Sequence, residues 1–221
     1  MDLGQTIVVY LGIFLILWYA VALIYNRRLG IRTYRWLQPG VATLGKITQA
    51  KWLGSSGSGA RIGVAQAKAP FRQAEVAFLL ETRELLPLWL LNRLRGIRDS
   101  LVVRVQLRSV PQGELEILPQ GHSRFGDLLT ESKQNPWAML DRELPAGLRA
   151  AARGRNTDNM LESAKALLNE VGPGIRRLSL ARTAPHLILD MKIAQLRSEP
   201  SERFFHLLTK AFGGNQEPAD S

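Results

Sequence analysis

The fold class is predicted first from the stretch LVVRVQLRSVPQGELEIL at residues 101–118. In the first part of the run, apolar residues alternate with Arg104, Gln106 and Arg108, as in a strand that is buried on one face. The tripeptide at 111–113 is a turn signal, and ELEIL at 114–118 alternates again. We therefore expect these two strands to pair as an antiparallel β-hairpin.

The exposed side of this predicted hairpin carries charges of opposite sign. Arg104 and Arg108 lie on the first strand, and Glu114 and Glu116 lie on the second. Opposite charges on directly paired strands stabilise a hairpin. We therefore expect cross-strand ion pairs between these two sets.

The flanking segments predict further strands and helices. Residues 157–171 are the clearest helix, because their apolar residues fall on one face and a Gly-Pro-Gly sequence follows. Residues 84–95 also have helical spacing, with Pro87 tolerated in the first turn. The other predicted elements are strands at 74–82, 175–181 and 186–193 and helices at 124–133, 144–152 and 201–212.

This order of elements predicts an α+β domain with a largely antiparallel sheet and helices packed on its face. An apolar segment stands before that domain. We divide the chain into a transmembrane anchor at 1–26, a basic juxtamembrane collar and flexible loop at 27–60, a cytosolic α+β domain at 61–212, and a disordered tail at 213–221.

The anchor is predicted from residues 3–26, which contain no formally charged side chain. About 20 helical residues cross the hydrocarbon core of a bilayer, so this length is sufficient. The alternative is a cleaved signal peptide, since Ala20-Val21-Ala22 has the small-residue pattern of a cleavage site. The leader MDLGQ has no Lys or Arg, and arginines follow the apolar run at once, which favours an uncleaved anchor.

Positive charge is concentrated directly after the anchor. Residues 27–108 hold 15 basic and 4 acidic side chains, whereas residues 109–221 are neutral overall. The positive-inside rule therefore predicts a single-pass protein with its N-terminus outside and its C-terminal domain in the cytoplasm.

We expect a collar of basic residues at the membrane surface, and two kinds of anionic ligand are alternatives for it. Arginines that alternate with aromatic residues suit anionic lipid headgroups, and they also suit RNA or a ribosome at the membrane surface. The collar residues are Arg27, Arg28, Arg32, Arg35, Lys46 and Lys51.

The segment between the collar and the domain contains two breaks. Gln38-Pro39-Gly40 predicts the end of any helix that starts in the membrane. A short amphipathic helix is expected at 41–53, followed by a flexible loop, GSSGSG, at 54–59. This loop lacks the Lys-Ser/Thr ending of a phosphate-binding loop, so a solvated linker is the favoured interpretation.

Residues that would indicate catalysis are scarce. The chain has no cysteine, and its three histidines are widely spaced, so neither thiolate chemistry nor a histidine metal cluster is expected. His186 reads as structural, and Asp190 alternates away from its apolar neighbours towards solvent. We expect no enzyme, no cofactor and no small-molecule substrate.

Binding is expected at the leucine-rich helix instead. Its apolar side chains predict a groove that receives a partner segment, lined by Leu85, Leu88, Trp89, Leu91 and Leu94.

Two stretches carry a family resemblance: residues 74–107, AEVAFLLETRELLPLWLLNRLRGIRDSLVVRVQL, and residues 162–193, ESAKALLNEVGPGIRRLSLARTAPHLILDMKI. Their order of strand, leucine-rich helix, strand, and later helix–strand–strand unit resembles the cytosolic domain of the coiled-coil-domain-containing subunit of the PAT complex. That subunit belongs to the eukaryotic multipass translocon. The resemblance covers about two-thirds of the chain and rests on element order, because the family has no short catalytic motif.

The resemblance implies a membrane-anchored accessory factor that assists membrane-protein insertion by binding translocon, insertase or ribosome partners. Family members carry a long acidic lumenal segment, associated with calcium, before the span, and a basic coiled-coil tail. Here only MDLGQ precedes the span and the ending is not basic, so neither calcium nor that ribosome contact is transferred. The alternative function is a structural, membrane-tethered module of an envelope complex that makes no ribosome contact.

Overall fold

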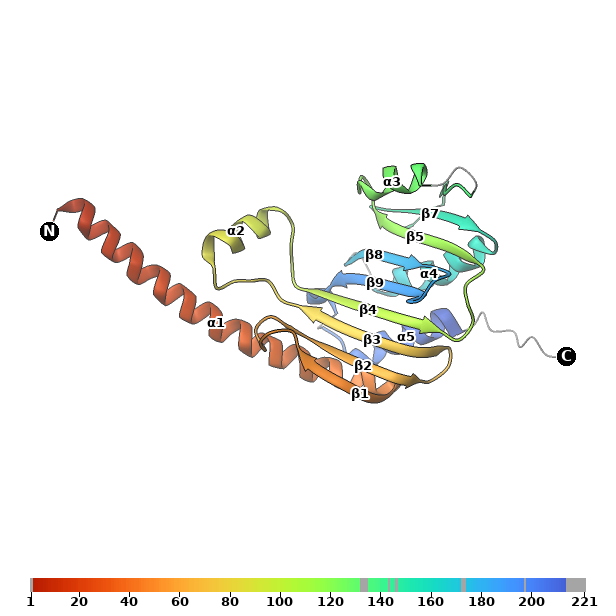
Figure 1. Cartoon of the computed structure of the whole chain (residues 1–221), viewed down its shortest axis with the longest axis horizontal. Helices are drawn as coiled ribbons and strands as arrows, with labels where there is room; N and C mark the ends of the chain where they lie inside the picture. Colours follow the sequence, from red (N-terminus) through yellow and green to blue (C-terminus); the bar gives the residue numbers. More distant parts are fainter. Residues whose placement is uncertain are drawn as a thin grey trace.

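The computed structural model describes residues 2–131, 135–142, 144–145, 147–171, 174–196 and 198–213. Figure 1 shows a long helix that projects from a twisted sheet. The elements are α1 Leu3–Leu44, β1 Gly45–Trp52, β2 Gly59–Ala67, β3 Phe71–Leu79, α2 Leu86–Leu94, β4 Ser100–Leu107, β5 Gly113–Pro119, α3 Arg124–Thr130, β6 Ala138–Leu140, β7 Leu148–Gly154, α4 Thr157–Val171, β8 Ile175–Leu180, β9 Leu187–Lys192, a 3₁₀ turn Ile193–Gln195, and α5 Ser201–Gly213.

The predicted α+β class is confirmed. Nine strands form one sheet in the order β1-β2-β3-β4-β9-β8-β5-β7-β6, and every pairing is antiparallel. Helices α4 and α5 lie behind the sheet in Figure 1, and their apolar faces join its core. The predicted strands near β3, β8 and β9 and the helices at α2, α4 and α5 are also confirmed.

Helix α1 does not end at Gln38-Pro39-Gly40, and the prediction of a break there is wrong. Its 42 residues form one continuous helix with Pro39 inside. The Ser201 hydroxyl at the start of α5 donates to the Trp36 carbonyl and accepts from the Gly40 amide. A helix accommodates proline where neighbouring groups satisfy the disturbed turn, and Ser201 does this here.

Since Ser201 is buried and makes both of these hydrogen bonds, we expect Ser201→Ala to lower the free energy of unfolding by about 1–2 kcal/mol. Urea unfolding of the full chain in detergent measures the change. Ser109→Ala removes an exposed serine hydroxyl and serves as the control. Equal midpoints for the two variants would contradict the role given to Ser201.

The helix predicted at 41–53 is wrong, because the chain turns at Gly45 and continues as β1. Strand β1 pairs with β2, so the expected domain boundary at residue 61 falls inside the sheet. Apolar positions spaced by three or four residues fitted a helix, but Ile47 and its neighbours pair across the sheet edge. Tertiary pairing overrides local spacing in such short runs.

The predicted 101–118 hairpin is also wrong, although both of its strands exist. Strand β4 lies between β3 and β9, and β5 lies between β8 and β7. Alternation identifies the buried face of a strand but not the strand that pairs with it. The expected ion pairs are replaced by Arg104–Glu75, Arg153–Glu114, and contacts of Glu116 with Arg124 and Arg177. Arg108 instead donates to the Phe71 and Ala67 carbonyls.

The helix predicted at 144–152 is wrong for a related reason. Alanine favours helices, yet Ala150 and Ala151 are fully buried in β7, between β5 and β6. Small side chains suit this position because both neighbouring strands bring larger ones. The predicted helix at 124–133 is confirmed as the shorter α3, and its last residues, with nearly all of the predicted tail, lie outside the described residues.

Candidate membrane-exit site

A single N-terminal apolar helix, α1, fits a single-pass membrane anchor, and it is the one helix of the described chain long and apolar enough to cross a bilayer. Most of its first 25 residues are exposed, whereas its second half is buried against the domain on one side. The buried stripe of the second half includes Leu29, Leu37, Val41 and Leu44. One continuous helix therefore serves as the apolar segment and as part of the domain core.

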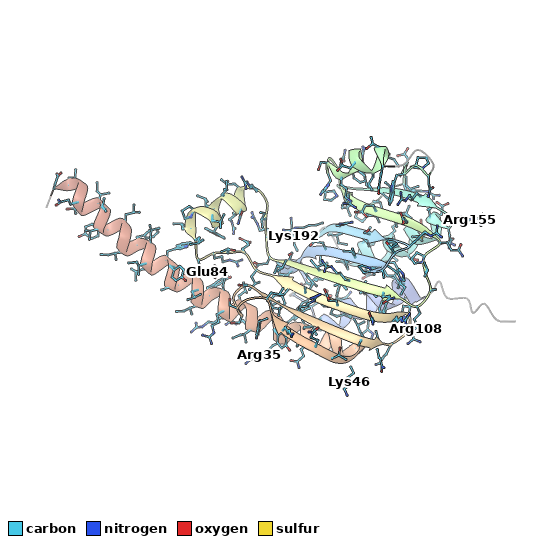
Figure 2. All side chains as sticks on the ribbon, viewed as in Figure 1. Arg35, Lys46, Glu84, Arg108, Arg155 and Lys192 are labelled. Atoms are coloured by element: carbon cyan, nitrogen blue, oxygen red, sulfur yellow. The ribbon has the colours of Figure 1, made fainter. Side chains whose placement is uncertain are left out.

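The junction between these two parts is marked by a fully buried polar residue, Asn26. Its side-chain amide donates to the Glu81 carbonyl at 2.8 Å and to Oε1 of Glu84 at 3.0 Å. Its carbonyl oxygen accepts from Arg83 at 2.9 Å. Figure 2 places Glu84 between α1 and α2, where this network ties the two elements together.

Arg83 is the cation of the network. Its guanidinium pairs with Asp99 at 2.9 Å and lies 5.5 Å from the centre of the Tyr25 ring. Burial alone lowers the pKa of Arg83, but the hydrogen bond and charge of Asp99, with a smaller contribution from Glu81, raise it above the ordinary value. The guanidinium is therefore a fixed charge that holds residues 81–99 against α1.

Two tryptophans complete the junction. The Trp18 indole donates to the Arg83 carbonyl at 2.9 Å, and its ring centre lies 5.5 Å from that of Trp89. The Trp89 indole donates to Oε2 of Glu81, also at 2.9 Å. A cleft of about 340 Å³ lies between the helices, lined by Trp18, Val21, Ala22, Tyr25, Arg83, Trp89 and Arg93.

The leucines of the predicted groove lie on the outside of α2. None of the nine residues of this helix is buried. Leu85, Leu88, Leu91 and Leu94 are exposed, and only Trp89 of the predicted set lines the cleft. The predicted leucines therefore form an exposed apolar surface on α2. The cleft itself lies between Trp89 on α2 and residues of α1.

The structure brings together only part of the predicted collar. Arg27, Arg28, Arg32 and Arg35 are exposed on α1, and the last three share one helical face. Lys46 lies at the far end of the domain, near Arg108 in Figure 2, because α1 continues past the collar before the chain reverses. Lys51 is exposed on the returning strand β1.

The GSSGSG segment is part of the junction, and the prediction of a solvated linker is wrong. It forms the turn between β1 and β2 and packs on α1. A Cβ placed on Gly30 would lie 1.7 Å from the Ser56 carbonyl oxygen. The Tyr34 and Trp52 rings also pack against each other in a tilted arrangement, with their centres 5.3 Å apart, so this hairpin is fixed to α1.

The sheet face opposite α4 and α5 carries polar groups that the junction does not use. A cavity of about 520 Å³ there is lined by residues that include Gln73, Glu75 and Arg104. His186 is buried and accepts a hydrogen bond from the Leu107 amide, in keeping with a structural residue. Among the described residues, no three His, Cys, Asp or Glu side chains converge as metal ligands.

Asp190 is only partly exposed, contrary to the expectation that it faces solvent. Its Oδ1 is buried and has no hydrogen-bond partner among the described residues. Burial raises the pKa of Asp190, although Arg176 and Arg177 oppose the shift. The native state therefore binds a proton more tightly than the unfolded state does, so stability falls as pH rises from the ordinary pKa of the carboxyl through the raised one.

We therefore expect Asp190→Asn to raise the unfolding midpoint at pH 7 and to flatten its fall between acidic and neutral pH. Urea unfolding of the full chain in detergent at several pH values measures both effects. Asp141→Asn neutralises an exposed aspartate and is the control. A variant that retains the pH slope of the parent chain would contradict the assignment.

Sequence reasoning missed the polar half of the junction, namely Asn26, Glu81, Arg83 and Asp99. One signal was present, since Asn26 is a polar residue at the end of a long apolar run. Its partners come from residues 81–84, more than 50 positions away, and no local pattern links them.

The sequence matches no protein-family model and no curated protein. The fold and the junction define the molecule as an α+β domain whose core includes the second half of a long apolar helix, and this helix fits a single-pass membrane anchor.

Proposed function

We propose that this protein is a single-pass, membrane-anchored accessory factor that assists the insertion or assembly of membrane proteins by binding. Its N-terminus lies outside and its domain lies in the cytoplasm. The observation that carries the proposal is that the anchor helix continues into the domain core, which holds the domain at the membrane surface in one orientation. A flexible tether would not give a binding surface a fixed height and direction.

The distribution of charge supports the orientation. Arg27, Arg28, Arg32 and Arg35 follow the apolar segment within ten residues, and all four are exposed. Basic residues beside a membrane span are retained on the cytoplasmic side. In this orientation they face anionic lipid headgroups. Ribosomal RNA is a second partner for them, and binding to it would bring the protein to ribosomes that synthesise membrane proteins.

The resemblance of residues 74–107 and 162–193 to the PAT-complex subunit supports the same role. In that role the protein contacts translocon or insertase subunits. The competing role is a tethered structural module of an envelope complex. These two roles predict different neighbours in the membrane.

Photo-crosslinking in native membranes tests the proposal. A photo-reactive residue at Gln38, which is exposed on α1 three residues after Arg35, is compared with one at Val110, which is exposed in the loop between β4 and β5. We expect mass spectrometry to identify insertase or translocon subunits with the Gln38 probe. Recovery of unrelated envelope proteins alone would exclude the proposed role in favour of the structural one.

Ribosome contact is tested separately by co-sedimentation. If the collar binds RNA, reversal of the charges of Arg32 and Arg35 will abolish sedimentation with ribosomes at low salt, because each phosphate contact adds to the salt-sensitive affinity. Charge reversal of Lys46, at the far end of the domain, will leave it unchanged. If the Arg32 and Arg35 variant sediments with ribosomes as the parent chain does, RNA binding by the collar is excluded and lipid is its ligand.

A further inference from the structure

We propose that α2 is a second membrane contact, an interfacial helix that lies in the same leaflet from which α1 emerges. Its leucines reach the acyl-chain region, and the arginines at its C-terminal end lie among the phosphates. This proposal rests on the membrane span of the proposed function and adds a lipid site that the span alone does not supply.

The first observation is the exposure of α2. Leu90 is 52% exposed and Leu94 is 79% exposed, although both belong to a helix that is fixed by hydrogen bonds at its base. Figure 1 shows α2 standing away from the sheet beside the middle of α1. The apolar residues exposed around it are Leu85, Leu88, Leu90, Leu91, Leu94 and Ile97. A cluster of this kind marks an interaction surface.

The second observation fixes the depth of α2. Trp89 contacts Trp18, which lies nine residues before Arg27, the first charge after the apolar run. At 1.5 Å per residue, Trp18 is about 13 Å further into the membrane than Arg27. Interfacial helices bury their apolar faces about 5–10 Å into the boundary between headgroups and acyl chains. The α1 wall of the cleft beside α2 runs from Trp18 to Tyr25, which lie about 13 Å and about 3 Å from Arg27 along the helix axis, so α2 spans the depth of an interfacial helix.

The third observation is the placement of charge on α2. Arg93 lies over the Trp89 ring at 5.3 Å, and Arg93 and Arg95 are both exposed. Arginine side chains at this end of the helix reach towards headgroups while their stems cover apolar surface. The N-terminal side of α2 instead meets the hydrogen-bonded network of Asn26, Arg83 and Glu84.

The occupant is lipid because the surface of α2 is continuous with that of the anchor. Val21, which is 67% exposed, lines the same cleft as Trp89, and the cleft is open between the two helices. Lipid that surrounds Val21 therefore also reaches Trp89 and the leucines. A cleft of about 340 Å³ with apolar walls and Arg93 at its edge suits an acyl chain below a phosphate.

Depth-dependent quenching tests the proposal directly. The chain contains no cysteine, so one introduced cysteine carries one fluorescent label. Labels are placed at Leu91 and Leu94 on α2, at Leu15 on the anchor as the lipid control, and at Val110 as the water control. The full chain is reconstituted at low density into phosphatidylcholine–phosphatidylglycerol vesicles that contain nitroxide lipids, and iodide is the aqueous quencher.

We expect the Leu91 and Leu94 labels to lose as much fluorescence to the nitroxide lipids as the Leu15 label, and to be shielded from iodide. The Val110 label will show the reverse. Quenching of the α2 labels by iodide alone would overturn the proposal. Shielding that appears only at high protein density, or only in native membranes, would assign the surface to a second copy or to a protein partner and would also overturn it.

The Leu15 label separates this inference from the proposed function. If the Leu15 label is quenched by lipid but the α2 labels are not, the anchor stands and the interfacial helix is excluded. If the Leu15 label is not quenched by lipid, the membrane span itself is excluded, and the proposed function falls with it.

Discussion

Asn26→Leu will lower the free energy of unfolding by about 2–4 kcal/mol, because the Glu81 carbonyl, Glu84 and Arg83 each lose a hydrogen bond to this buried side chain. Asn26 is fully buried and joins the Glu81 carbonyl, Glu84 and Arg83 across the junction. We expect α2 to detach from α1 before the domain unfolds. Urea unfolding of the full chain in detergent gives the stability, and trypsin cleavage after the exposed Arg93 and Arg95 reports detachment.

Gln38→Leu is the matched control for Asn26→Leu, because it makes a similar polar-to-apolar change at an exposed position of the same helix. We expect its unfolding midpoint and its cleavage rate at α2 to stay close to those of the parent chain. If both variants behave alike, the Asn26 network does not hold the junction together.

Gly30→Ala will destabilise the protein by about 3 kcal/mol. The loss is expected even though alanine has a higher helix propensity than glycine. The added methyl group would lie 1.7 Å from the Ser56 carbonyl oxygen, so either the β1–β2 turn or the helix must move. Backbone atoms supply the contact, and no side-chain rotation relieves it. Thermal unfolding of the full chain in detergent measures the loss.

Gly12→Ala controls for the helix itself. Beyond the backbone of its own helix and its two chain neighbours, no atom lies within 4 Å of a methyl group added at Gly12, which is in the apolar half of α1. We expect this variant to match the parent chain or to be slightly more stable. A Gly30→Ala variant as stable as Gly12→Ala would show that the hairpin turn does not pack on the anchor helix.

Elements that are defined by the spacing of their own apolar residues were predictable from the sequence. The apolar run at 3–26, the amphipathic face of α4 and the alternation in β4 each lie within one element, so their residues alone define them. Membership of the α+β class followed from the order of these elements. The exposed leucines of α2 were also identified, although as the lining of a groove.

Features set by distant partners were not predictable. A proline such as Pro39 normally ends a helix. Here the Ser201 hydroxyl, 161 residues further along the chain than Gly40, bonds to the helical turn that contains the proline. The segment at 41–53 was misassigned because β1 depends on pairing with β2. Likewise, β4 and β5 follow each other in sequence but are separated in the sheet by β9 and β8. Local spacing contains no information about these contacts, so the polar junction at Asn26 also escaped prediction.

Because α1 runs from the apolar segment into the domain core without a break, the two parts should move as one rigid body. The distance distribution between spin labels at Leu11, exposed in the apolar segment, and Val110, exposed on the domain, measures this in nanodiscs. We predict one narrow distribution. A broad distribution, as expected if Gln38-Pro39-Gly40 were a flexible joint, would show that the helix does not hold the domain in one orientation.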